Sequence, residues 1–294
     1  MFDVTTFAQL FVTGLAMGSI YALVALSFAL LYKAVGILNF AVGEFVMVPG
    51  FISVVLLTTL NVPFLWAYLV TLGIMVLFGV VFQRTVYHPL RGRPFVAVLV
   101  STIGASLFLR NTSLLAFGAD PRVSPGVFTV KTVSFFGVFV PPQYLLIIGT
   151  LIVLVVFQYL LFEKTLLGKK MQATAQDRDM ARLLGIPVDT VILITFIYAS
   201  LLGGISGILL APIFYVTADM GFMIALKAFA SSIAGGLGSI PGAIVGGLFI
   251  GVVELFCAAY ISATYKDVFA FVILIAVLLL RPQGFFGEKI AEKA

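Results

Sequence analysis

Long apolar runs, separated by short polar or Pro/Gly breaks, are the feature that most limits what this chain can fold into. Of its 294 residues, 62% are hydrophobic and 10% are charged. In an average soluble domain, about half of the residues are hydrophobic and about a quarter are charged. A single globule cannot enclose that much apolar surface. The composition therefore excludes an ordinary soluble enzyme, a disordered chain and a nucleic-acid-binding domain.

The apolar runs have the length of membrane-spanning helices. A bilayer core of about 30 Å requires about 20 apolar residues of helix. The predicted segments are residues 7–32, 35–60, 64–86, 95–117, 144–162, 190–216, 225–238, 243–261 and 268–280. The segment 225–238 is short, so it either crosses the membrane or is re-entrant. We expect an all-α polytopic membrane bundle of about eight or nine transmembrane segments, forming one transmembrane domain over residues 1–294.

The distribution of lysine and arginine predicts the orientation of the bundle. If the N-terminus is external and 225–238 crosses, most basic residues lie inside and only Arg122, Lys131 and Lys266 lie outside. Short loops rich in lysine and arginine are retained on the cytoplasmic side. We therefore expect an external N-terminus, a cytoplasmic C-terminus, and a first segment that is retained rather than cleaved.

Two loops are long enough to be elements of their own. The loop 163–189 carries much charge and is expected to be cytoplasmic. The loop 118–142 is expected to be external. Its apolar alternation around Val127 and Val133 indicates a short hairpin.

Glycines at a spacing of four residues predict close helix packing. In lipid, small residues allow two helix backbones to approach each other. The pairs are Gly14 and Gly18, Gly203 and Gly207, Gly242 and Gly246, and Gly247 and Gly251.

Candidate residues for catalysis or metal binding are few. The one histidine, His88, precedes a proline in a basic loop, and the one cysteine, Cys257, lies among apolar residues. Zinc sites need several His, Cys or carboxylate ligands, and the sequence has no Walker-type phosphate loop. The sequence therefore predicts no catalytic residue, no metal and no cofactor.

Ionisable residues inside the predicted segments are the strongest functional signal. They are Glu44, Arg110, Lys227 and Glu254, and Asn39 is a further polar group close to Glu44. Such residues are costly in lipid and face the interior of a bundle. They either form structural ion pairs or line a polar pathway. Glu44 and Lys227 are the better pathway candidates because each lies in a broken segment, whereas Arg110 marks the outer part of its span.

The charged stretch from Lys169 to Leu184 has apolar residues near helical spacing, and Gly185 and Pro187 end it. It predicts an amphipathic cytoplasmic helix or helix pair. The pattern fits a helix lying along the headgroups and a docking element for a cytoplasmic partner equally well.

Five stretches resemble the branched-chain amino acid ABC permeases, in particular their LivH-type subunits. They are residues 18–26, 38–45, 173–186, 227–254 and 281–287. Residues 173–186 are similar to the family's coupling loop, although Ala-Gln-Asp at 175–177 replaces the Glu-Ala-Ala of other importers.

The resemblance implies a permease subunit of an ATP-driven importer of leucine, isoleucine and valine, located in the bacterial inner (plasma) membrane. It implies as partners a second homologous permease, two cytoplasmic ATP-binding subunits that hydrolyse ATP, and an external solute-binding protein. This chain would then not be an enzyme. The implied ATPase-coupling residues are Ala173, Ala175, Asp177, Ala181, Arg182 and Gly185. The implied pathway residues are Asn39, Glu44, Lys227 and Glu254.

Two other functions remain open at this point. The first is import of another small polar solute, such as urea, an amide or a different amino acid. The second is an ion-coupled secondary carrier, which the scarcity of buried carboxylates and histidines disfavours. A membrane enzyme has little support because the sequence has no nucleophile–base pair or metal cluster.

Overall fold

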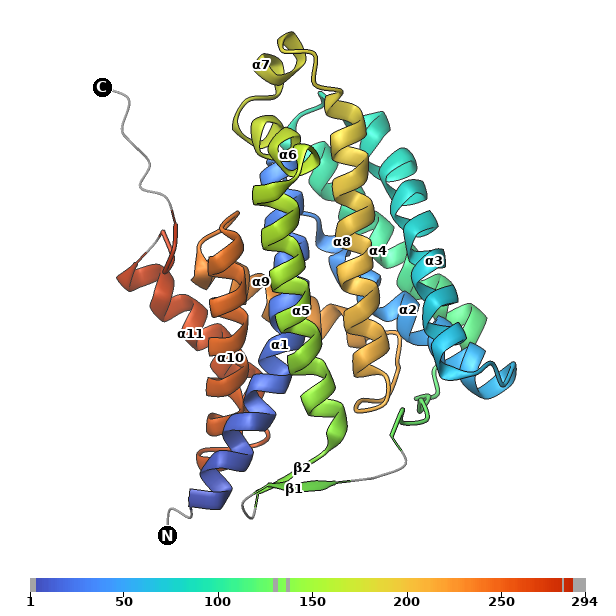
Figure 1. Cartoon of the computed structure of the whole chain (residues 1–294), viewed down its shortest axis with the longest axis vertical. Helices are drawn as coiled ribbons and strands as arrows, with labels where there is room; N and C mark the ends of the chain where they lie inside the picture. The colour runs from blue at the N-terminus through green and yellow to red at the C-terminus, as the bar shows by residue number, and fades with distance from the viewer. Residues whose placement is uncertain (1–3, 129–131, 136–137, 282, 288–294) are drawn as a thin grey trace. The chain divides into compact units, whose positions relative to one another are not determined.

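The computed structural model describes residues 4–128, 132–135, 138–281 and 283–287, and this part of the chain is mostly helical (Figure 1). In chain order the elements are α1 (Val4–Val35), η1 (Phe40–Gly43), α2 (Glu44–Val54), η2 (Val55–Thr59), α3 (Phe64–Phe82), η3 (Gln83–Tyr87), η4 (His88–Leu90), α4 (Phe95–Phe117), β1 (Val133–Phe135), β2 (Val138–Val140), α5 (Pro142–Lys164), α6 (Leu166–Gln176), α7 (Arg178–Leu183), α8 (Val188–Leu210), α9 (Met220–Gly235), α10 (Ile240–Tyr260) and α11 (Lys266–Leu280). The elements η1 and η4 are 3-10 turns, and η2 and η3 are π turns that continue α2 and α3.

The predicted membrane segments all fall on helices, which confirms the all-α polytopic bundle. Within the described residues, 7 helical stretches are long and apolar enough to cross a membrane. Two further apolar helices, α9 with 16 residues and α11 with 15, are shorter than a standard span. The prediction for 190–216 was too long, because α8 ends at Leu210 and the chain then turns.

The helices group into two compact units that alternate along the sequence. Unit 1 comprises Met1–Ala29, Phe128–Leu151 and Ile224–Ala294, and unit 2 comprises Leu30–Val127 and Ile152–Met223. In unit 2, α2 and α3 pack along α8, and in unit 1, α10 packs on α11. The boundaries fall within α1, α5 and α9, so each of these helices contributes to both units.

Glycines bring α1 and α10 of unit 1 into backbone contact. A Cβ atom on Gly18 would lie 2.8 Å from the Cα of Leu248, and one on Gly14 would lie 2.8 Å from the Cα of Val252. From the other side, a Cβ atom on Gly251 would overlap the backbone of Gly18. Two of the predicted small-residue pairs therefore face each other across one helix crossing, as lipid-embedded helices require.

The remaining predicted glycine pairs also lie at close contacts. Gly203 and Gly207 of α8 lie against α2 in unit 2, and Gly242 and Gly246 of α10 lie against α9 in unit 1. The four-residue spacing was therefore a reliable signal of helix contact in this chain.

A Gly251→Val variant is expected to lower the thermal unfolding midpoint of the detergent-purified protein. The added side chain would push α10 away from the Gly18 backbone, and overpacking of this kind costs about 1–3 kcal/mol. The matched control is Gly149→Val in α5, where a Cβ atom would meet nothing within 4 Å. Equal midpoints for the two variants would contradict the assigned helix contact.

The loop 118–142 contains the expected short hairpin. Strands β1 and β2 pair antiparallel, with Val133 opposite Val140 and Phe135 opposite Val138. The strands begin later than the alternation around Val127 suggested, and Lys131 lies outside the described residues.

Candidate translocation site and coupling helices

The predicted pathway residues lie in two polar groups, one within each unit. Asn39 and Glu44 belong to unit 2, and Lys227 and Glu254 belong to unit 1. All four residues are buried, each with at most 7% of its surface exposed. Polar side chains at such burial need partners, because an unpaired buried polar group costs about 1–3 kcal/mol.

Asn39 shapes the break between α1 and α2. The chain leaves α1 through Gly36, whose φ of +66° is accessible to glycine at little cost. The Asn39 Oδ1 atom then accepts a hydrogen bond from the backbone N–H of Ala41 at 3.0 Å, which caps η1. Its Nδ2 atom is buried and has no hydrogen-bond partner.

Glu44 is the first residue of α2 and is 1% exposed. Its Oε1 atom accepts a hydrogen bond from the Ser106 hydroxyl at 2.8 Å, while its Oε2 atom is buried without a partner. Ser106 is the middle residue of α4 (Phe95–Phe117), which is one of the candidate membrane spans. Glu44 therefore lies beside the middle of a span rather than near its end.

An ion pair flanks this carboxylate. Arg110, one turn beyond Ser106 on α4, pairs with Asp219, which directly precedes α9. Both charges interact electrostatically with Glu44. We call Glu44, Ser106, Arg110 and Asp219 the Glu44 cluster; it lies wholly within unit 2.

The starts of α2 and α9 meet at this cluster. A Cβ atom on Gly221, in the first turn of α9, would overlap the carbonyl group of Gly43, which directly precedes α2. Two helices thus begin next to each other, close to the middle of α4. Helix α2 continues directly from η1, and its Glu44 N–H already donates to the carbonyls of Ala41 and Val42. The positive helix end nearest the cluster is therefore the start of α9.

Lys227 and Glu254 are bonded to each other in unit 1. The Lys227 Nζ atom lies 2.6 Å from Glu254 Oε1 and 2.6 Å from Asp267 Oδ1, and it donates to the Tyr21 hydroxyl at 3.3 Å. We call Tyr21, Lys227, Glu254 and Asp267 the Lys227 cluster. It joins α1, α9, α10 and the first turn of α11.

The structure thus supplies partners that sequence reasoning missed. Asp219 and Asp267 lie in stretches interpreted as loops, so they were not counted among the intramembrane charges. Ser106 and Tyr21 carry no charge and gave no signal. The usable signal was the position of each aspartate at the start of an apolar helix, where a carboxylate is stabilised by the helix dipole.

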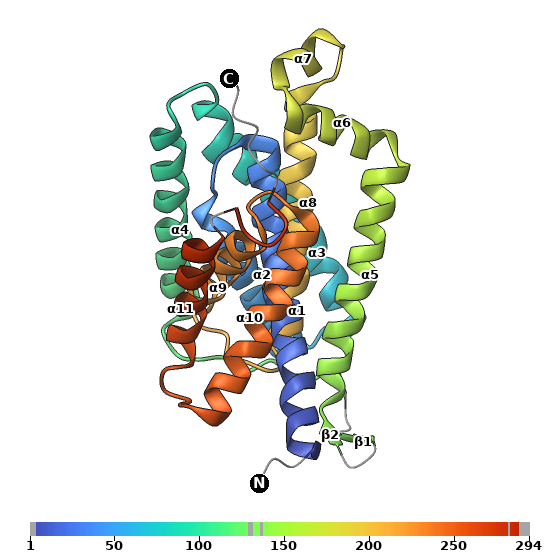
Figure 2. The same ribbon diagram turned by 90° about the vertical axis from the view of Figure 1, so that its left-hand side faces the viewer.

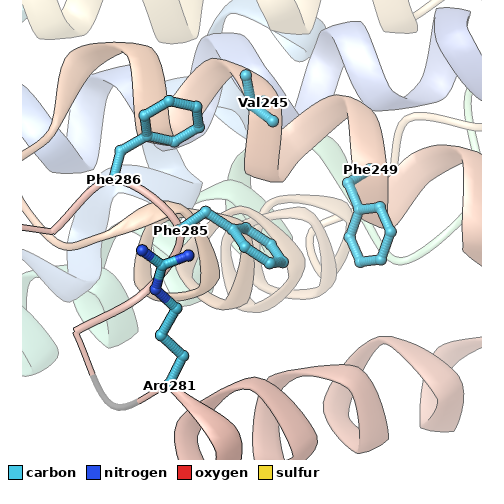
Figure 3. A pocket seen from close by; sticks show the side chains of 5 residues that line it. All are labelled: Val245, Phe249, Arg281, Phe285 and Phe286. Atoms are coloured by element: carbon cyan, nitrogen blue, oxygen red, sulfur yellow. The ribbon is translucent and has the colours of Figure 1, made fainter.

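A shallow hollow of about 400 Å³ in unit 1 contains none of the predicted pathway residues (Figure 3). Its lining is apolar apart from Arg281 and consists of Val245, Phe249, Arg281, Phe285 and Phe286. Among the described residues, no group of three or more His, Cys, Asp or Glu side chains is placed to hold a metal ion.

The stretch 163–189 forms the predicted helix pair. Helices α6 and α7 lie at the end of unit 2 where α8 begins (Figures 1 and 2). Asp177 separates them, and its carboxylate accepts hydrogen bonds from the backbone N–H groups of Asp179 at 2.9 Å and Met180 at 3.0 Å. Gly185 ends the pair with a φ of +77°.

One face of the helix pair packs on α8, and the other face is exposed. Ala181 is 2% exposed, and both α6 and α7 contact α8. In contrast, Met180, Leu183 and Leu184 are 60%, 81% and 79% exposed. These three residues form an exposed apolar patch on the helix pair. Of the other predicted coupling residues, Arg182 is exposed and Ala173 and Ala175 are half-buried.

Comparisons with known proteins identify the class. The family described as branched-chain amino acid transport system / permease component matches residues 10–278. The high-affinity branched-chain amino acid transport system permease protein BraD of Pseudomonas aeruginosa is 36% identical, over 99% of this chain and 99% of its own. The corresponding permease protein LivH of Escherichia coli K12 is 33% identical, over 98% and 97%. A probable LivH protein of Methanocaldococcus jannaschii is 27% identical, over 92% and 89%.

This chain therefore belongs to the branched-chain amino acid transport system permease family. It is a multi-pass, membrane-spanning permease component of an importer.

Proposed function

We propose that this chain is the permease subunit of an ATP-driven importer of leucine, isoleucine and valine. The observation that carries the proposal is the likeness to BraD and LivH over nearly the full length of both chains. The matched regions include the coupling stretch and both polar clusters.

The importer would contain three further kinds of component. A homologous permease completes the membrane pathway, two cytoplasmic ATPases hydrolyse ATP, and an external binding protein delivers the amino acid. The ATPases would dock on the exposed patch of Met180, Leu183 and Leu184, with Ala173, Ala175, Asp177, Ala181, Arg182 and Gly185 holding the helix pair in place. Because α6 and α7 contact α8, a movement of the pair would be passed directly to a membrane span.

Within the chain, Asn39, Glu44, Lys227 and Glu254 are the proposed pathway residues. An amino acid that crosses a membrane needs polar groups in place of its hydration shell. Among the described residues, Asn39, Glu44 and Glu254 each have one buried atom without a hydrogen-bond partner. Glu254 is already paired with a cation, because Lys227 bonds to it and to Asp267, whereas Glu44 has no bonded cation. Asn39 and Glu44 are therefore stronger candidates for contact with the substrate than Lys227.

Reconstitution tests this function. The chain, its co-encoded permease and its ATPases are placed in liposomes, the binding protein is added outside and ATP is enclosed. Uptake of radiolabelled leucine, isoleucine and valine should require both ATP and the binding protein. It should persist when ionophores collapse the ion gradients.

The alternatives give different results in the same assay. Uptake of urea or an amide, with none of the three amino acids, would indicate another substrate class. Uptake that depends on an ion gradient and survives ATP depletion would indicate a secondary carrier. Either result would overturn the proposed function.

The orientation belongs to the same proposal, with the N-terminus external and the C-terminus cytoplasmic. Arg91 pairs with Asp189 at 2.5 Å, so the basic loop before α4 and the end of the loop 163–189 lie at one end of unit 2. Two basic loops at one end support a cytoplasmic location for that end.

Cysteine labelling is expected to report this orientation. In a Cys257→Ser background, a membrane-impermeant thiol reagent should label Val123→Cys but neither Lys170→Cys nor Arg281→Cys. Val123 is 59% exposed, whereas the neighbouring Ser124 is 3% exposed and would be a poor reporter. External labelling at position 281 would show that α9 is re-entrant and that the C-terminus is outside.

A further inference from the structure

In the Glu44 cluster one carboxylate oxygen has no hydrogen-bond donor among the residues that the structure describes. Glu44 is 1% exposed, and Ser106 satisfies only its Oε1 atom. The Oε2 atom is buried and unpartnered. A carboxylate inside an apolar span is costly, and such residues are kept where they serve a pathway. A ligand with a cationic donor would remove this cost.

The charges around Glu44 also favour a cation. The cluster contains two carboxyl groups, Glu44 and Asp219, and one guanidinium, Arg110, so its formal charge is −1 when both carboxyl groups are ionised. The side chains of Arg110 and Asp219 are 34% and 65% exposed. A ligand can therefore reach both charged groups from outside the chain.

The backbone around the cluster favours an anion at the same place. Helix α9 begins next to Gly43, as the close approach of Gly221 to the Gly43 carbonyl shows. Helix N-termini attract carboxylates, and broken helices in transporters direct them at the anionic group of a substrate. Arg110 adds a guanidinium, which binds a carboxylate with two parallel hydrogen bonds.

Cation and anion sites at one mid-span position match a zwitterion. Resting on the proposed function, we propose that the Glu44 cluster is a transient subsite for an α-amino acid. Glu44 Oε2 accepts from the substrate ammonium, and Arg110 exchanges Asp219 for the substrate carboxylate. Asp219 is thus the internal competitor that holds Arg110 in position while the subsite is empty. Urea and neutral amides would leave the charge of Glu44 without compensation.

Uptake by variants in the reconstituted importer tests this subsite. We expect Glu44→Gln and Arg110→Gln to lower the initial rate of leucine uptake at least tenfold. Arg110→Lys, which keeps the charge but loses the bidentate geometry, should give an intermediate rate. Asp219→Asn should instead lower the half-saturating leucine concentration, because the competitor of the substrate carboxylate is gone.

Exchanging the two charges distinguishes substrate binding by Arg110 from a purely structural Arg110–Asp219 ion pair. The double variant Arg110→Asp/Asp219→Arg restores the pair with reversed direction, and we expect it to assemble normally by size-exclusion chromatography but to remain inactive in uptake. The control is Arg84→Gln, an exposed residue of unit 2 outside the cluster, which should transport at the wild-type rate.

Three results would overturn the subsite. They are equal losses in Arg110→Gln and Asp219→Asn, recovery of uptake in the charge swap, and wild-type uptake by Glu44→Gln. In each case the wild-type importer still takes up leucine, so the proposed function stands. Failure of the wild-type importer to take up any zwitterionic amino acid would instead overturn the function itself.

Discussion

A Lys227→Met variant is expected to lose most of its folded yield in detergent and to unfold at a markedly lower temperature. The substitution removes the cation that Glu254 and Asp267 share at 2.6 Å each. The buried Glu254 carboxylate, inside α10, would then lose its bonded cation, and its Oε2 atom already has no partner among the described residues. Breaking a buried ion pair by removing one partner costs about 3–5 kcal/mol. Fluorescence-detected size exclusion and a thermal melt measure the effect.

The matched control is Lys266→Met, which removes the same charge and adds the same side chain at the start of α11, where Lys266 is half-exposed. Adding Glu254→Gln to Lys227→Met should recover part of the stability, because the neutral amide is cheaper to bury than the carboxylate. If Lys227→Met and Lys266→Met melt at the same temperature, the Lys227 cluster contributes nothing to the fold.

This prediction refines what the sequence indicated about Lys227 and Glu254. Sequence reasoning kept structural pairing and pathway lining open, and it placed Lys227 among the better pathway candidates. The structure bonds Lys227 to two carboxylates and Tyr21, which is the arrangement expected of a structural pair. Pairing across residues 227, 254 and 267 depends on tertiary contact, so no local pattern could predict it.

The helices themselves were predictable because the bilayer sets their length and composition. Residues 95–117 coincide with α4, and each other predicted segment overlaps a helix. The ends were less predictable where apolar sequence continues past the helix. Residues 211–216 are mostly apolar, yet they turn back and Val216 pairs with Arg122 through an isolated β-bridge. Hydropathy cannot distinguish a spanning helix from an apolar turn buried by protein.

The π turns η2 and η3 had no sequence signal at all. They extend α2 and α3 at residues 55–59 and 83–87, where the composition is that of an ordinary helix. Asn39 was identified as a polar group near Glu44, but its role as the cap of η1 follows from the φ of Gly36 and the position of Ala41. These are backbone properties that emerge only when the chain folds.

The coupling helices yield the prediction with the largest effect on activity. Asp177→Lys and Gly185→Leu are each expected to abolish most binding-protein-stimulated ATP hydrolysis in the assembled importer, while the chain still inserts. The lysine removes the cap of α7, worth about 1 kcal/mol, and sets a cation at a positive helix end. A helix as short as α7 has little stability without its cap. The leucine is strained by the φ of +77° at residue 185, although open space surrounds that position.

Both variants should act through the same patch, since each displaces Met180, Leu183 and Leu184 from the surface that we expect the ATPase to contact. Asp179→Asn is the matched control for Asp177→Lys, because the Asp179 side chain is 90% exposed and makes only a surface pair with Arg182. Gly185→Ala should lose nearly as much as Gly185→Leu, because both side chains meet the same backbone strain at a φ of +77° and open space surrounds the position. Retention of the ATPases on the membrane complex, measured by pull-down, should fall in parallel with stimulated hydrolysis.

Wild-type stimulation in both Asp177→Lys and Gly185→Leu would show that the ATPases do not depend on α7, and that the α6–α7 helix pair instead lies along the lipid headgroups.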